Sequence, residues 1–307
     1  MSTLSVIVPA TNHPATLPQC LAAIQDAASP PEQLLVVEDA SLTHPALARN
    51  SGAAKAAGDI LVFIDADVTV HRDVFEKFRA AFAADQNLVA IFGSYDDAPA
   101  SPGIVSEFRN LLHHHVHQEG AGPAGTFWAG LGAMRRSAFE AAGGYSVHPI
   151  EDIELGMRLV DGGARIVLDP TIQGTHLKHW SLLGMVRTDL FVRGIPWVGL
   201  LMDRRGSASL SGLNLGWRHR ISALASVALL LGLLLRNVWL LGGALAVMVV
   251  FNLRFYRLLW RRQGPWRTCL GVGLHAIHHL VSVLAVPLGL LAHLRAGRRA
   301  VARVAAA

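Results

Sequence analysis

A run of apolar residues, Ile60–Ile64, ends directly in two acids, Asp65 and Asp67. Such a run without alternating polar residues is typical of a strand buried on both faces of a parallel sheet. In open α/β sheets, ligands bind at the carboxyl ends of such strands. Two carboxylates at that place can share Mg²⁺ or Mn²⁺ with phosphate oxygens. Taken by itself, however, the pair is also compatible with a solvated turn rich in Asp.

The surrounding pattern alternates apolar runs with helical stretches and indicates an α/β fold. The expected strands are 4–8, 34–37, 60–64 and 88–92, and the helices between them are 17–28, 45–57 and 73–84. Right-handed crossovers in a doubly wound parallel sheet would bring the carboxyl ends of the first three strands to one edge. The second strand also ends in acids, Glu38 and Asp39. An acidic edge is therefore expected.

Charge divides the chain into two parts with different solvents. Residues 1–215 hold 15 Lys or Arg and all 22 Asp or Glu, a net charge of −7, whereas residues 216–307 hold 12 Arg and no acid. Only 16% of all residues are charged, which is low for a soluble protein. The Arg residues of the second part flank apolar runs, which favours anionic lipid headgroups over nucleic acid as their partner.

The second part, residues 216–307, contains the apolar stretches 221–235, 238–251 and 269–294. The third is long enough to span a membrane, whereas the first two must include flanking residues or form a shallow hairpin. Arg residues before the first and third stretches predict that these ends are cytosolic. Arg residues after the third stretch also favour the cytosol by the positive-inside rule. Three full spans cannot place both ends of the third stretch there, so either the rule is broken at the C-terminus or one stretch is re-entrant.

The junction between the two parts has features of a membrane surface segment. Residues 178–202 mix Trp, Arg and Leu, which indicates an amphipathic segment in the membrane interface, and residues 206–216 form a Ser- and Gly-rich linker. The N-terminus lacks the basic and long apolar regions of a signal peptide, so the first part is expected in the cytosol.

Two further polar groups are candidates for a site. Glu151 and Asp152 open a helical pattern, where helix capping is the alternative to a catalytic role. His113 and His117 lie four residues apart on the expected helix 104–118 and could hold a metal. Packing is favoured for these two His, because no acid or Cys completes a ligand set.

Seven short motifs, in this order and spacing, resemble membrane-attached family 2 glycosyltransferases of the GT-A fold. The motifs are Ser5-Val-Ile-Val-Pro9, Val37-Glu-Asp-Ala-Ser41, Ala48-Arg-Asn-Ser-Gly52, Gly58-Asp59, Asp65-Ala-Asp67, Gly143-Gly-Tyr145 and Glu151-Asp152. The resemblance covers residues 4–180. It implies a Rossmann-like GT-A domain at 1–215, followed by a membrane domain at 216–307.

The resemblance also implies roles for individual residues. Those expected to bind the nucleotide-sugar donor are Pro9, Glu38, Asp39, Arg49, Asp65 and Lys178. Those expected to hold Mg²⁺ or Mn²⁺ are Asp65, Asp67 and His176. Glu38 and Ala40 stand where the family has Asp and Gly.

On the acceptor side, the resemblance assigns catalysis to Asp152, with Glu151 beside it. Asp152 matches the acid that serves as the general base in inverting members of the family. Trp128 and Trp180 are expected to touch the acceptor.

The implied activity is inverting, metal-dependent transfer of a sugar from a nucleotide-diphosphate sugar to a lipid-linked or membrane-proximal glycan acceptor. The protein is expected in the cytoplasmic membrane as a multi-pass protein with a cytosolic catalytic domain. Alternatives are another GT-A reaction type, a processive polysaccharide synthase, or a non-catalytic membrane scaffold with a nucleotide-binding fold. Processive members carry a Gln-x-x-Arg-Trp segment that Leu177-Lys178-His179-Trp180 matches only in part, so transfer of single sugars is expected.

Overall fold

The computed structural model describes residues 2–204 and 216–305, with side chains described up to residue 296. The chain divides into two units, which meet in the sequence at His179 and Trp180. The expected domain boundary at residue 215 and nearly all of the expected linker lie outside the described residues.

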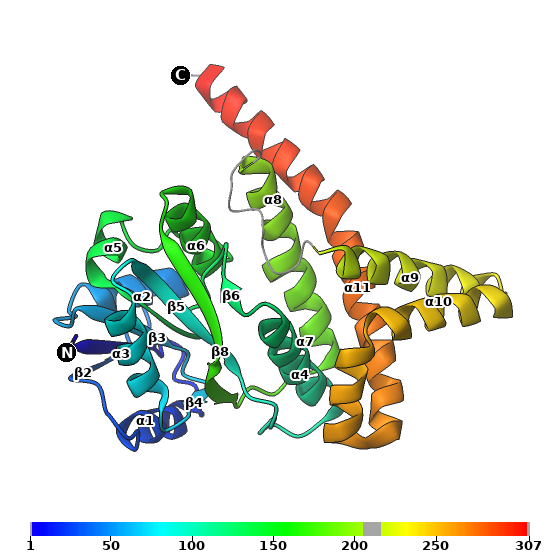
Figure 1. The fold of residues 1–307 in the computed structure, drawn as a ribbon. Coiled ribbons are helices and arrows are strands. Elements are labelled where there is room, and N and C mark those ends of the chain that lie inside the picture. The colour runs from blue at the N-terminus through cyan, green and yellow to red at the C-terminus, as the bar shows by residue number, and fades with distance from the viewer. Residues whose placement is uncertain (1, 205–215, 306–307) are drawn as a thin grey trace. The chain divides into compact units, whose positions relative to one another are not determined.

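The first unit is built on an eight-stranded sheet with the order β2-β1-β3-β7-β5-β8-β4, and β6 pairs with β8 (Figure 1). The strands are β1 Leu4–Pro9, β2 Gln33–Val37, β3 Ile60–Ile64, β4 Val68–Val70, β5 Leu88–Tyr95, β6 Gly122–Pro123, β7 Leu131–Arg135 and β8 Arg165–His176.

Strand directions confirm the expected parallel core and add a feature that the sequence did not indicate. β1 pairs in parallel with both β2 and β3, so these three strands end at the same edge. β7 lies between β3 and β5 and runs antiparallel to both. The sheet is therefore mixed, with β5 and β8 again parallel to each other.

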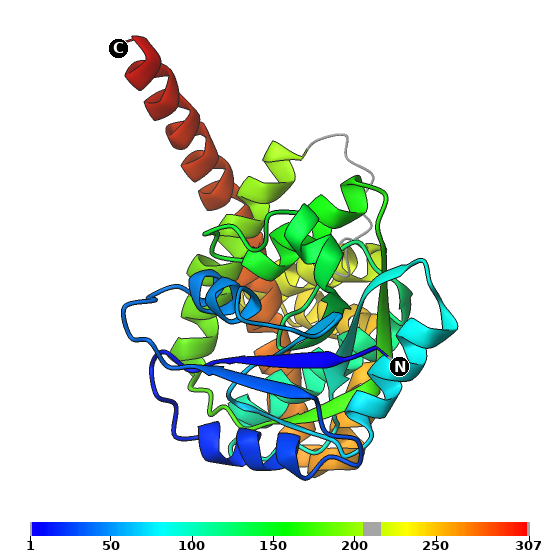
Figure 2. The ribbon, with the colours of Figure 1, turned by 90° about the vertical axis from the view of Figure 1, so that its left-hand side faces the viewer.

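Helices cover both faces of this sheet. They are α1 Leu17–Gln25, α2 Pro45–Ala53, α3 Val74–Ala84, α4 Ile104–Glu119, α5 Arg136–Ala141 and α6 Glu151–Asp161. Figure 2 shows β1 and β2 side by side in blue, with α1 below them.

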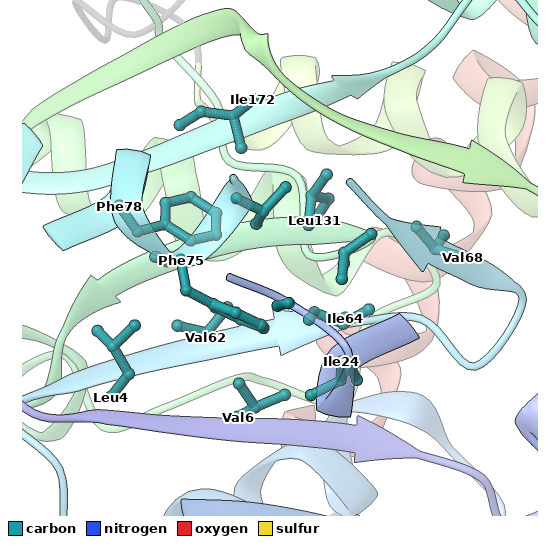
Figure 3. Packing of buried hydrophobic residues seen from close by; sticks show 14 of the residues in the cluster. Leu4, Val6, Ile24, Val62, Ile64, Val68, Phe75, Phe78, Leu131 and Ile172 are labelled. Carbon is teal, nitrogen blue, oxygen red and sulfur yellow. The ribbon is translucent and has the colours of Figure 1, made fainter. Parts of the chain in front are cut away.

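The continuous apolar sequence of β3 is explained by burial on both faces. Val62 and Ile64 pack with Phe75 and Phe78 of α3 on one face (Figure 3). Leu61 and Phe63 pack on the other face with residues of α2, α5 and α6. Since side chains alternate across a strand, both sets must be apolar, and the first polar residue, Asp65, marks the end of the strand.

Helix α6 lies in direct contact with the chain that precedes β7. A Cβ atom added at Gly156 would lie 2.1 Å from the backbone nitrogen of Phe127, far closer than atoms can approach. This close approach fixes the depth of α6, and with it the position of Glu151 and Asp152 in its first turn.

The described residues of the second unit form helices joined by short turns. Its helices are α7 Leu182–Arg187, the π-helix η1 Thr188–Gly194, α8 Ile195–Asp203, α9 Trp217–Leu234, α10 Val238–Phe251 and α11 Leu253–Ala305. α11 breaks at Gly264, whose φ is 79°, next to Pro265. The helical residues before that break were not expected from the sequence.

Two helices of the second unit, α9 and the segment Leu253–Ala296 of α11, are long and apolar enough to cross a membrane. The first two apolar stretches form a helical hairpin whose turn contains Arg236, with φ 52°, and Asn237. The Asn237 side chain caps α10 by accepting hydrogen bonds from the N–H groups of Trp239 and Leu240. Arg298, Arg299 and Arg303 have side chains outside the described set.

Polar contacts join the apolar helices of this unit. The Asn252 amide donates to the Ser222 hydroxyl at 2.8 Å, and the Tyr256 hydroxyl lies 3.0 Å from His275 Nδ1. Asp189 of η1 pairs with His278 of α11 at 2.9 Å. Such contacts satisfy polar groups that would otherwise be costly among apolar helices.

We expect Gly156→Ala to destabilise the protein by about 1–3 kcal/mol, because the new methyl group overlaps the Phe127 backbone. Thermal unfolding of the detergent-solubilised protein measures this as a lower midpoint. Gly199→Ala in α8 is the matched control, since its Cβ would meet nothing within 4 Å. Equal midpoints for the two variants would contradict the close packing of α6.

Candidate active site

Asp65 and Asp67 lie in the short connection between β3 and β4. The Asp65 N–H donates to the Gly130 carbonyl at 3.1 Å, and the Asp65 carbonyl accepts from the Val68 N–H at 3.0 Å. This backbone is thus fixed on both sides. The two carboxylates have different partners, Arg49 for Asp65 and His176 for Asp67.

Arg49 is buried and joins two carboxylates from different elements. Its Nη2 lies 2.7 Å from Asp65 Oδ1, and its Nη1 donates to Glu151 Oε1. Burial alone would lower the pKa of the guanidinium, but the carboxylates outweigh burial and raise it, so Arg49 remains a cation.

Burial raises the pKa of the two acids that bind Arg49, Glu151 and Asp65. It raises the pKa of Glu151 to about 7, an effect that the Arg49 cation opposes and the Asp152 carboxylate reinforces. It also raises the pKa of Asp65, again against the effect of Arg49. The negative charges of Glu151 and Asp65 therefore both depend on the Arg49 cation.

Asp67 and His176 form the second pair. Asp67 Oδ2 lies 3.6 Å from His176 Nε2, and the Leu177 N–H donates to the Asp67 carbonyl at 2.8 Å. Burial would raise the pKa of Asp67, yet its bond to His176 and the nearby Lys178 cation lower it, so Asp67 is an anion. His176 is the last residue of β8 and stacks on Tyr95, with ring centroids 4.2 Å apart.

These residues fit a divalent cation that also binds phosphate. Among the described residues, no three His, Cys, Asp or Glu side chains are grouped so that they could hold a metal by themselves. Asp67 and His176 supply a carboxylate and an imidazole, both ordinary ligands of Mn²⁺, and phosphate oxygens would have to complete the set. Asp65 lies close by, but one of its oxygens is bound to Arg49.

Asp152 is held at the start of α6 by two backbone donors. Its Oδ2 accepts from the Ala129 N–H at 3.2 Å, and its Oδ1 accepts from the Ile153 N–H at 2.8 Å. The second bond is local, to the next residue, and is not a cap: the N-cap residue of α6 is Ile150, and no side chain caps this helix. The first bond ties Asp152 to the segment that carries Trp128 and Gly130. Because Gly130 binds Asp65 as well, one short segment contacts both acids.

An aromatic cluster surrounds Trp128. Tyr95 and His113 lie 4.9 Å and 4.6 Å from it between ring centroids, and His117 lies 5.2 Å away. His117 donates to the Gly93 carbonyl, and burial lowers its pKa to about 4, so it is neutral. His113 and His117 therefore pack around Trp128, as the packing interpretation expects. Tyr95 was missed in the sequence, where its only signal is an aromatic residue at the end of a strand.

The remaining predicted residues lie at neighbouring positions. Pro9, Glu38 and Asp39 lie at or just beyond the ends of β1 and β2, on the edge that β3 shares. Asp39 is exposed and accepts hydrogen bonds from the N–H and hydroxyl of Ser41, which lower its pKa. Lys178 follows His176 near Asp67, and Trp180 begins the second unit.

A second ion pair, also missed in the sequence, secures the strand that carries His176. Asp96 Oδ2 lies 2.9 Å from His71 Nε2 and accepts from the hydroxyl of Thr175, the neighbour of His176. His71 directly follows β4, whose Val68 is paired with His176. Asp96 thus joins the ends of β4, β5 and β8.

Comparison with known proteins agrees with this fold. The profile described as Glycosyl transferase family 2 matches residues 43–143, which include Arg49, Asp65 and Asp67. A mannosyltransferase from Pyrobaculum calidifontis, solved with GDP-Man and Mn²⁺, is 16% identical with a TM-score of 0.54, over 95% of this chain and 87% of that one. At this identity the likeness shows a shared GT-A fold.

Other solved structures are more distant. GalNAc-T7, solved with UDP, GalNAc and Mn²⁺, is 14% identical with a TM-score of 0.46, over 72% of this chain and 51% of that one. Residues 1–349 of S. aureus TarS are 13% identical with a TM-score of 0.45, over 91% and 90%. No curated protein sequence matches the chain.

The His71–Asp96 pair predicts a pH-dependent stability. The bond to Asp96 raises the pKa of His71 above its ordinary 6.5. Its stabilisation is therefore complete below that pH and is lost as pH rises through the raised pKa. We expect His71→Gln to lower the free energy of unfolding more at about pH 6 than at about pH 8.5. The difference should be under about 1 kcal/mol, because His71 is partly solvated. A difference that is constant with pH would contradict this.

Proposed function

We propose that this family 2 glycosyltransferase is an inverting, metal-dependent enzyme that transfers single sugars from a nucleotide-diphosphate sugar to a lipid-linked or membrane-proximal acceptor. The observation that carries the proposal is the meeting of two acidic groups at one sheet edge. Asp67 pairs with His176, while Asp65 is joined through Arg49 to Glu151, beside Asp152.

In the proposed reaction, Asp152 is the general base. The acceptor hydroxyl oxygen forms a bond to the anomeric carbon as its proton passes to Asp152. The bond from that carbon to the diphosphate oxygen breaks, and the nucleoside diphosphate leaves from the opposite face, which inverts the configuration. Asp152 suits this task because backbone N–H groups of Ala129 and Ile153 hold the carboxylate in place.

On the donor side, Asp67 and His176, with Asp65, would hold Mg²⁺ or Mn²⁺. When bound, such a cation offsets the negative charge that the diphosphate gains as it leaves. The proposed nucleotide contacts are Pro9, Glu38 and Asp39, and Lys178 would contact the diphosphate. Trp128, in its aromatic cluster, and Trp180 are the proposed acceptor contacts.

We place the second part of the chain, residues 216–307, in the cytoplasmic membrane and residues 1–215 in the cytosol. Support comes from the two helices long enough to span, the absence of acids in this part, and its exposed apolar side chains. Trp239 is 89% exposed and Leu235 is 70% exposed, which suits contact with lipid.

The test is a screen of nucleotide sugars with the detergent-solubilised protein, Mn²⁺ or Mg²⁺, and membrane lipid extract. We expect one donor to release its nucleoside diphosphate only when both the cation and the lipid are present. Release that needs no acceptor lipid would contradict the proposed acceptor class, and the absence of release with every donor would contradict the activity.

Asp67→Ala should weaken nucleotide binding in the presence of Mn²⁺ by about 100-fold or more, because the cation would lose its carboxylate ligand beside His176. Titration of UDP and GDP with and without Mn²⁺ measures this. Asp73→Ala is the control, since Asp73 pairs with Lys77 at the surface. A nucleotide affinity of Asp67→Ala that still rises with Mn²⁺ as in the wild type would refute the assignment.

Asp152→Asn should bind donor normally but lose about 10²- to 10⁴-fold in turnover, because an amide cannot take the proton. Donor titration and product release measure the two effects separately. Asp161→Asn, at the other end of α6, is the control. Normal turnover by Asp152→Asn would exclude it as the base.

A further inference from the structure

Arg49 connects three elements that are far apart in the sequence. It is 6% exposed on α2, and its terminal nitrogens bind Asp65 after β3 and Glu151 at the start of α6. The Glu151 side chain is 10% exposed and that of Asp65 is 33% exposed. Glu151 is thus more buried than Asp65, so its negative charge depends more on Arg49 and less on solvent.

The same region of α2 makes a second connection toward α6. Asn50 donates to the Tyr145 carbonyl at 2.8 Å and accepts from the Tyr145 N–H at 2.9 Å. The Tyr145 ring lies 5.6 Å from the Arg49 guanidinium. Gly144 has φ +71°, and a Cβ there would lie 2.8 Å from the Asn50 side chain. The pairing therefore requires glycine at 144 and holds Arg49 in one place.

This geometry bears on the expected contact between Arg49 and the donor. Both terminal nitrogens of Arg49 already have carboxylate partners, and its Nε is buried without a hydrogen-bond partner. The N–H groups that remain lie on nitrogens already bound to carboxylates or on the buried Nε, so a donor phosphate would have to approach two anions to reach them. A role that uses the observed contacts needs no such approach.

We propose that Arg49 is a positioning residue that holds the base helix, α6, in register with the Asp65–Asp67 connection. By binding Asp65 and Glu151 together, it sets the separation between the donor side of the site and Asp152. The Ala129–Gly130 segment makes a parallel link, through Asp152 and the Asp65 backbone. This inference rests on the proposed function, because it assigns Asp152 the role of base.

The test compares Arg49→Met, Glu151→Gln and the double variant. Arg49→Met leaves the buried Glu151 either charged without a cation or protonated away from its ordinary pKa, and both are costly. Helix α6 should therefore shift, and turnover should fall by about 100-fold, the typical cost of a small misplacement. Donor affinity should stay within about threefold, because Asp67 is held by His176 and not by Arg49. Glu151→Gln in the same chain removes the cost of the unpaired carboxyl group, charged or protonated, and should restore part of both the unfolding midpoint and the turnover.

Arg79→Met is the matched control, because Arg79 also links two elements through an ion pair, with Glu32 at 3.0 Å, away from the site. It should lower the unfolding midpoint and leave turnover unchanged. A large loss of donor affinity in Arg49→Met with unchanged turnover at saturation would overturn the proposal and make Arg49 a donor ligand.

Unfolding midpoints separate this inference from the proposed function, since they need no turnover. If the double variant is no more stable than Arg49→Met, Arg49 does not position α6 through Glu151, whatever the activity. If the wild type transfers no sugar from any donor, the proposed function fails, and Asp152 cannot be the base that Arg49 positions.

Discussion

A buried guanidinium needs anionic partners, and this requirement organises the first unit. The partners of Arg49 lie 16 and 102 residues away along the chain. A cation in the protein interior is tolerated only when such partners are in place. α2, β3 and α6 must therefore reach their final positions together. Gly144 lies against the Asn50 side chain of α2, and Gly156 of α6 lies against the Phe127 backbone, so neither position has room for a side chain.

The features that could be predicted from the sequence are those with a local signal. Burial on both faces made β3 continuously apolar, so both its length and the position of Asp65 could be recognised. The strands β1, β2 and β3 follow the alternation of apolar runs and helices, and their shared edge follows from the handedness of crossovers. Glu151 and Asp152 were placed correctly at the start of a helix.

What was missed depends on pairing over long distances. Residues 126–134 carry no clear period, and the insertion of β7 between β3 and β5 depends on partners elsewhere in the chain. Tyr95 and the Asp96–His71 pair act through β8, far away in sequence. The resemblance to a family assigned Arg49 a type of partner, the donor, but could not reveal that Glu151 and Asp65 each bind one of its two terminal nitrogens.

The hydrogen bond from the Leu177 N–H to the Asp67 carbonyl has a mechanical consequence. It lies only three residues before Trp180, where the second unit begins. It fixes the backbone one residue after His176, on the first unit's side of the junction. The Asp67–His176 pair is therefore held by a main-chain bond as well as by its side chains.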